Sequence, residues 1–107
     1  MIIHKLHDMK AGWFVGDFTP TAYKTTDFEV CYRIHPKGEI WDTHYHTKVT
    51  EINLLISGKM KLQDTLLEAG DIFILSPYEI ADPVFLDDCA IVCIKNASIL
   101  GDKIVVK

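Results

Sequence analysis

Short segments in which apolar and polar residues alternate with a period of two run along most of this chain. They are rich in β-branched and aromatic residues, which is typical of β-strands, while a helical repeat of 3.6 residues is nearly absent. The alternation predicts strands at residues 28–35, 43–47, 51–56, 59–63, 71–75 and 90–95, and weaker ones at 13–15, 84–86 and 104–106.

Turn-forming residues separate these predicted strands. They lie at positions 35–38, 57–58, 69–71, 76–77 and 86–88, and most contain glycine or proline. Because isolated short strands are only marginally stable, the strands must close on a common core. Many short strands at regular spacing are typical of a β-sandwich or β-barrel, so we predict an all-β fold.

Length and composition exclude several classes of protein. The chain has 107 residues, which is enough for one domain with a single core and too few for two. Its formal net charge of -4 does not suit a nucleic-acid-binding protein. The first residues lack the apolar region of a signal peptide, and no apolar run is long enough to cross a membrane. We therefore expect a cytoplasmic protein.

The three cysteines, Cys31, Cys89 and Cys93, do not have the spacing of a zinc finger. If Cys89 and Cys93 share a strand, their Cα atoms are roughly 13 Å apart. That distance is too long for a disulfide. We predict reduced, buried thiols.

Two histidines separated by one residue, His44 and His46, provide the main functional signal. In a strand they point to the same face, with Tyr45 on the other, so both imidazoles can bind one ion. Four residues separate His46 from Glu51, which is enough to turn the chain and return the carboxylate from a neighbouring strand. Such a set leaves coordination positions open, as in catalytic zinc and non-haem iron(II) sites. The alternative from this spacing is a solvated strand face that Glu51 does not contact.

The flanking glycines make this segment resemble the first motif of the cupin family. That motif is glycine, five residues, His-x-His, three or four residues, glutamate, six residues and glycine. Gly38, His44, His46, Glu51 and Gly58 match every fixed position.

The segment that begins at Gly70 resembles the opening of the second cupin motif. Asp71 follows the glycine, then a strand, and then Pro77, one position later than in the family pattern. The histidine expected eleven residues after the glycine is missing, and Ala81 stands in its place. Three alternatives follow: Asp82 supplies the fourth ligand, water completes the coordination, or the site is empty.

The resemblance implies a cupin-type double-stranded β-helix, or jelly-roll barrel, as one domain over residues 1–107. It implies a divalent metal ion in the barrel mouth, held by His44, His46 and Glu51, with Asp82 as the candidate fourth ligand. The ligand set does not distinguish zinc, nickel, manganese and iron. The resemblance also implies a homodimer.

Residues near the motif are candidates for substrate binding. Strand parity places Asn53 on the same face as Glu51 unless a bulge intervenes. Aromatic residues, chiefly Trp41 and Tyr78, are candidates for the wall of a pocket, with barrel or dimer packing as the alternative.

Two residues are candidates for catalysis. Glu79 lies in the turn that reaches the barrel mouth, and Lys95 follows Cys93 on one strand face. For each of them the alternative is a solvated surface position. The remaining histidines, His4, His7 and His35, have no partner at ligand spacing, and we assign them to the surface.

These features favour a metal-dependent enzyme. The ion would act as a Lewis acid in an isomerase, epimerase or lyase on a sugar-like or other small polar substrate. An iron-dependent dioxygenase uses the same ligand set. Two alternatives are a small-ligand or carbohydrate-binding module without turnover and a metal-free barrel with a hydrogen-bonded cluster.

Overall fold

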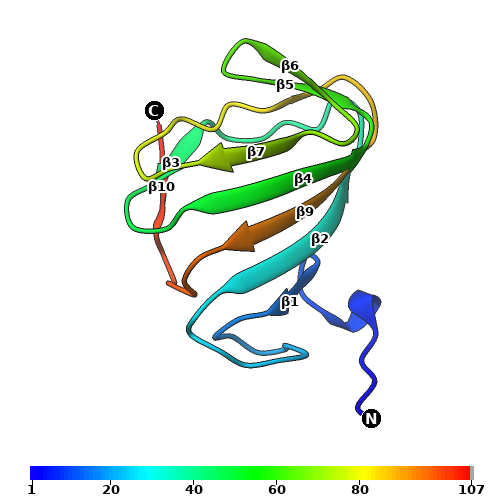
Figure 1. Ribbon diagram of the computed structural model, residues 1–107, viewed down its shortest axis with the longest axis vertical. Helices are drawn as coiled ribbons and strands as arrows, with labels where there is room; N and C mark the ends of the chain where they lie inside the picture. The colour runs from blue at the N-terminus through cyan, green and yellow to red at the C-terminus, as the bar shows by residue number, and fades with distance from the viewer. Residues whose placement is uncertain (107) are drawn as a thin grey trace.

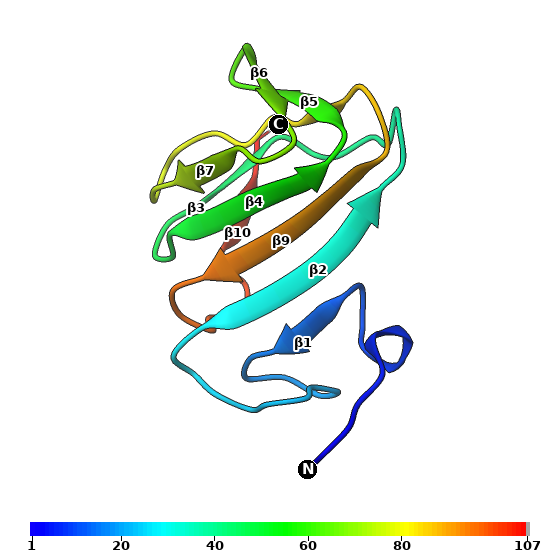
Figure 2. The ribbon, with the colours of Figure 1, turned by 45° about the vertical axis from the view of Figure 1, so that its right-hand side comes forward.

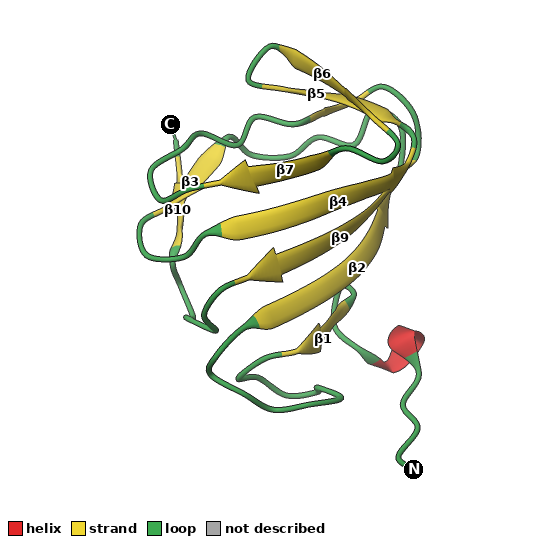
Figure 3. Cartoon of the chain, in the orientation of Figure 1, coloured by secondary structure: helices red, strands yellow, loops and turns green. Residues whose placement is uncertain are grey.

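The computed structural model describes residues 1–106, and its regular secondary structure is almost entirely β-strand (Figure 3). A short 3-10 helix, η1 (Leu6–Asp8), precedes them. The strands are β1 (Trp13–Val15), β2 (Glu29–His35), β3 (His44–His46), β4 (Glu51–Ser57), β5 (Lys59–Leu62), β6 (Thr65–Glu68), β7 (Ile72–Leu75), β8 (Val84–Phe85), β9 (Cys89–Lys95) and β10 (Lys103–Val105). Every predicted strand is present, so the all-β prediction is confirmed. In the described part of the chain, no helix has the length and apolarity needed to span a bilayer.

Strand β6 is the one that the sequence pattern does not predict. Its central residues, Leu66 and Leu67, are adjacent leucines, which interrupt the alternation of apolar and polar residues. Pairing with β5 in an antiparallel hairpin nevertheless places this segment in a strand.

The strands form two layers. The larger layer is an antiparallel sheet with the order β1-β2-β9-β4-β7. The other layer contains the β6-β5-β8 sheet and the β10-β3 pair. A backbone pair between His44 and Ala81 joins β3 to the segment that leads into β8. In Figures 1 and 2 the hairpin of β5 and β6 lies at the opposite end of the molecule from β1.

Apolar side chains from the two layers meet in the core. Leu55 on β4 and Ile91 on β9 pack with Met60 on β5 and Phe85 on β8. Burying each large apolar side chain contributes about 1.5 to 3 kcal/mol to stability. This contact closes the barrel at one end and leaves room between the layers at the β3 end.

The outer face of the large sheet is aliphatic. Along β4, Glu51, Asn53 and Leu55 point inward, so Ile52 and Leu54 point outward. Six large aliphatic residues on this face are 38% to 67% exposed to solvent: Ile34, Ile52, Leu54, Ile56, Ile72 and Ile74. We call these six residues the aliphatic face.

Candidate metal centre

The structure brings His44, His46 and Glu51 together inside the barrel. Both histidines lie on β3 with their side chains buried, and Glu51 begins β4. His46 Nε2 is 3.1 Å from Glu51 Oε2. One candidate ligand atom from each of the three residues lies within 4.8 Å of the other two, a separation that a single metal ion can bridge. We call these three residues the triad.

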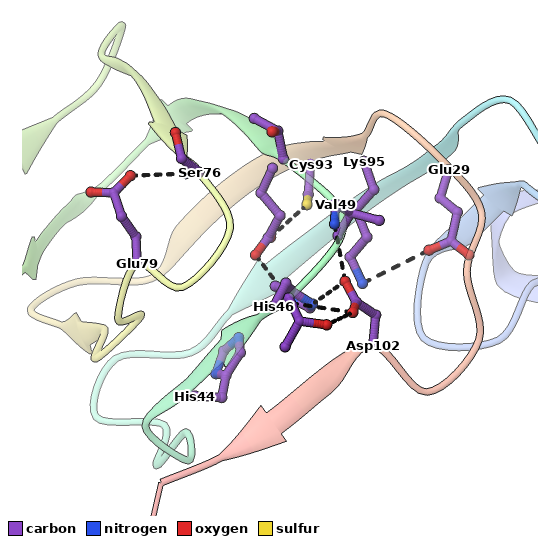
Figure 4. A network of polar contacts seen from close by, with 12 residues as sticks. Glu29, His44, His46, Val49, Ser76, Glu79, Cys93, Lys95 and Asp102 are labelled. Atoms are coloured by element: carbon purple, nitrogen blue, oxygen red, sulfur yellow. Dashed lines mark hydrogen bonds and ion pairs between the residues drawn. The ribbon is translucent and has the colours of Figure 1, made fainter.

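The surroundings of the imidazoles suit metal binding. His44 Nδ1 lies 2.8 Å from the carbonyl oxygen of Asp42, which can only accept a hydrogen bond. Nδ1 is therefore the protonated nitrogen, and Nε2 keeps its lone pair for an ion. Burial lowers the pKa of His44, which favours the neutral form that metals require. His46 Nδ1 is buried without a hydrogen-bond partner and lies 3.9 Å from Asp102 Oδ2 (Figure 4).

Glu51 is held as a carboxylate by two neighbours. Burial by itself raises its pKa, but hydrogen bonds from His46 and Cys93 outweigh burial and hold the pKa at about 2. The Cys93 thiol donates to Glu51 Oε1 over 3.0 Å, while Oε2 faces His46 (Figure 4). Burial, together with the charge of Glu51, raises the pKa of Cys93, so this thiol keeps its proton. All three cysteines are free thiols, as predicted; Cys31 and Cys89 are buried, whereas Cys93 is only partly buried.

Asp102, just before β10, fixes the turn that joins β3 to β4. Its oxygens accept hydrogen bonds of 2.6 to 3.2 Å from the backbone N–H groups of Thr47, Lys48 and Val49 and from the Thr47 hydroxyl. Burial raises the pKa of Asp102, but these donors outweigh it and hold the pKa at about 2. Sequence reasoning missed this role, because nothing in the local pattern links Asp102 to a turn so far back along the chain.

Asp82 does not join the triad. Its Oδ1 accepts the backbone N–H of Gln63 at 2.7 Å. Ala81 pairs with His44 and lines the cavity, so strand alternation turns the next side chain away. The prediction of Asp82 as a fourth ligand is therefore corrected, and the position of the missing histidine holds only a methyl group.

The triad lines a cavity of about 290 Å³ between the two layers. Trp41 and Asn53, two of the predicted substrate contacts, also line it. So does Lys95, whose Nζ is 3.8 Å from Glu29 Oε1 and 4.7 Å from the centre of the Trp13 ring. With its side chain only 20% exposed, Lys95 is not on a solvated strand end.

Tyr78 and Glu79 lie outside the cavity. Tyr78 is 69% exposed and stacks on Tyr45. Glu79 Oε2 accepts the backbone N–H of Ser76 and closes its own turn (Figure 4). These positions do not suit the substrate contact predicted for Tyr78 or the catalytic role predicted for Glu79.

His35 lines the cavity instead of the surface, which corrects its assignment. Its ring stacks on Phe85 with centroids 4.5 Å apart, and its Nδ1 is 2.8 Å from Glu39 Oε1. Strand parity on β2 predicts that His35 shares a face with Cys31 and Arg33, and the structure shows that this face lines the cavity. His4 and His7 are exposed, as expected.

Comparison with known proteins shows the fold. No family model and no curated protein matches the sequence. A double-stranded β-helix protein from Klebsiella pneumoniae is similar in structure, with a TM-score of 0.68 and 21% identity over 77% of this chain and 72% of that one. A cupin protein from Bacteroides fragilis is also similar, with a TM-score of 0.57 and 25% identity over 78% of this chain and 80% of that one.

A longer enzyme shares the same architecture. The DMSP lyase DddQ from Ruegeria pomeroyi gives a TM-score of 0.72 and 11% identity over 88% of this chain and 49% of that one. This chain therefore spans about half of the enzyme. Taken with the arrangement of its strands, these likenesses show that the protein has the cupin fold, a double-stranded β-helix.

Proposed function

We propose that the protein is a metal-dependent enzyme of the isomerase, epimerase or lyase type that acts on a small polar molecule. The observation that carries this proposal is the convergence of two imidazoles and a carboxylate on one point of an internal cavity. A divalent ion bound there would supply a Lewis acid that polarises an oxygen of the substrate. The lyase with the same fold supports this class of chemistry.

The residues of the cavity have separate tasks in this proposal. His44, His46 and Glu51 hold the ion, and the surrounding apolar side chains exclude water. Lys95 is the candidate for proton exchange with the substrate, because it lines the cavity and is the register partner of Glu51 on the neighbouring strand.

Metal analysis combined with an activity screen tests the proposal. Protein purified without added metal is expected to contain a divalent ion, and His46→Ala is expected to lose it. His7→Ala, at an exposed position, is the matched control. Keto sugars, unsaturated uronates and small diketones form the substrate panel, and turnover is expected only with the ion bound. Saturable binding without product would instead indicate a binding module, and a metal-free protein that gains no ion on loading would refute the proposal.

A dioxygenase is the second candidate function. With Asp82 turned away, the protein ligands are two histidines and one carboxylate, which is the set used by non-haem iron(II) oxygenases. Oxygen-electrode measurements on the iron-loaded protein separate the two candidates. Substrate-dependent consumption of dioxygen would favour the oxygenase, and equal turnover without dioxygen would exclude it.

We also propose that the protein forms a homodimer through the aliphatic face. Monomers rarely expose an apolar patch of more than a few hundred Å². The strands β2, β4 and β7, which carry this face, and β9, which lies between β2 and β4, have no charged residue at their outward positions. Their spacing and length give a face on the order of 400 Å² in projection, which is about half of the ~800 Å² that each partner of a standard dimer buries. An uncharged aliphatic sheet face can pack against the same face of another copy, so a second copy is the partner that fits.

A further inference from the structure

We propose that the cavity recognises a small organic acid, with Lys103 and Arg33 binding its negative charge and Asn53 donating a hydrogen bond to one of its oxygens. This inference deepens the proposed function by naming the substrate class. It rests on that function only for the idea that the same cavity is the active site.

Asn53 is the first observation. It is 5% exposed and lines the cavity, yet its Nδ2 has no hydrogen-bond partner. Its register neighbours are Phe73 on β7 and Cys93 on β9, and the Cys93 thiol is already bonded to Glu51. A buried amide donor without an acceptor is destabilising, and an oxygen of a bound ligand would satisfy it.

The position of Asn53 places that ligand oxygen near the triad. Asn53 lies two residues after Glu51 and shares its inward face. Neighbours at this spacing on one strand face are close enough for one small molecule to contact both. A ligand that reaches the triad therefore passes the unpaired amide.

Two cations that line the cavity, Arg33 from β2 and Lys103 from β10, are the second observation. Lys103 Nζ and Arg33 Cζ lie 5.1 Å and 5.0 Å from the centre of the Trp41 ring. Within residues 1–106, no carboxylate lies within 4.0 Å of Lys103. Arg33 reaches Glu39 only at 4.0 Å, and the same carboxylate oxygen is 2.8 Å from His35. Neither cation is well neutralised by the protein.

The charge balance of the cavity is the third observation. Arg33, Lys95 and Lys103 line it, and Glu51 is the one carboxylate among the described residues that do so. The chain as a whole has a net charge of -4, so this positive lining is local. A divalent ion bound by the triad would add to the positive charge of the cavity. Such a cavity favours an anion over a neutral sugar and disfavours a cationic ligand.

The size of the cavity limits the acid. About 290 Å³ lies at the small end of ligand pockets. Aromatic and aliphatic side chains make up most of the remaining wall, so the carbon skeleton of the ligand is short and does not need to be rich in hydroxyl groups. Small hydroxy, oxo or dicarboxylic acids fit these requirements.

Calorimetric titration with matched acids and amides tests the inference. Lactate and malonate are compared with lactamide and malonamide, at low ionic strength, on the full chain in metal-free and zinc-loaded form. The acids are expected to bind at least about tenfold more tightly than the amides in both forms, because charge recognition belongs to the protein. Equal affinity for acids and amides would overturn the inference.

Variants assign the recognition to residues. Lys103→Gln and Arg33→Gln are each expected to weaken acid binding by about tenfold, whereas Lys59→Gln, on the exposed side of β5, leaves it unchanged. Asn53→Leu is expected to weaken binding and at the same time raise the unfolding temperature, because it removes an unsatisfied buried donor. Acid affinity that survives in both Lys103→Gln and Asn53→Leu would overturn the inference.

Metal content measured on the same samples separates this inference from the proposed function. If acid binding depends on Lys103 but the protein takes up no metal, the inference is supported and the proposal of a metal-dependent enzyme is refuted. If the protein binds zinc but does not distinguish acids from amides, the inference is refuted and the metal site of the proposed function is supported.

Discussion

At the scale of single residues, the contact between Cys93 and Glu51 determines how the carboxylate is presented. The thiol donates to Oε1, which leaves Oε2 directed at His46. Partners of this kind orient metal ligands, and their loss typically costs 10-fold to 100-fold in affinity. Cys93 therefore positions a ligand without being a ligand itself.

Replacing Cys93 tests this role. Cys93→Ala removes the donor and is expected to weaken zinc binding by about tenfold, because Glu51 is then free to rotate. Cys93→Ser keeps a donor and is expected to bind zinc nearly as wild type. Competition with a chromogenic chelator measures both affinities. Equal zinc affinity in the alanine variant and the wild type would contradict the role.

At the scale of elements, the turn between β3 and β4 sets the distance between the imidazoles and the carboxylate. The turn is held from outside by Asp102 rather than by its own sequence. Likewise, the turn between β4 and β5 depends on Gly58, which packs closely against the backbone of Asp88. Only the turn between β3 and β4 adjoins the triad, because Glu51 begins β4 and Gly58 follows its other end.

Asp102→Asn is expected to destabilise the protein by about 2 kcal/mol, because an amide group replaces one charged acceptor that faces backbone N–H donors. Asp64→Asn, at an exposed loop position, serves as the control. Urea unfolding of the metal-free proteins measures the difference. The same free energy of unfolding for both variants would show that Asp102 does not hold the turn.

The two glycines that end the first motif differ in what surrounds them. Gly58 has a φ of +95°, and a Cβ there would meet the carbonyl oxygen of Asp88 at 2.3 Å. Gly38 has a φ of +77° but open space around it. We expect Gly58→Ala to cost about 3 kcal/mol and Gly38→Ala about 1 kcal/mol. Thermal and urea unfolding measure the two losses of stability. Equal losses for Gly58→Ala and Gly38→Ala would contradict the prediction.

At the scale of the whole molecule, the large sheet has two different faces. Its inner face carries Glu51, Asn53, Arg33 and Lys95 and lines the cavity opposite β3 and β10, while its outer face is aliphatic. In a soluble protein such an outer face needs a cover. Dimerisation would bury it and leave both cavities inside their own barrels.

Charge introduced into the aliphatic face tests the dimer. Leu54→Lys and Ile74→Lys are expected to give monomers in light scattering after size exclusion, because a buried lysine without a partner is costly. Leu100→Lys, at a 98% exposed position outside this face, is the control and should remain dimeric. Circular dichroism confirms that the variants are folded. A monomeric wild type, or dimers in both face variants, would exclude this interface.

The sequence by itself determined the local features of this protein. Alternation set the strands, the His44-x-His46 spacing set two imidazoles on one face, and four residues sufficed to return Glu51. These follow from backbone geometry over a few residues. Only the tertiary structure decided that Asp82 turns away, that Cys93 meets Glu51, that Asp102 holds the turn and that His35 lies inside. The physical reason is that each of these depends on the register between strands distant in the chain, and a shift of one residue in that register would reverse which side chains face the cavity.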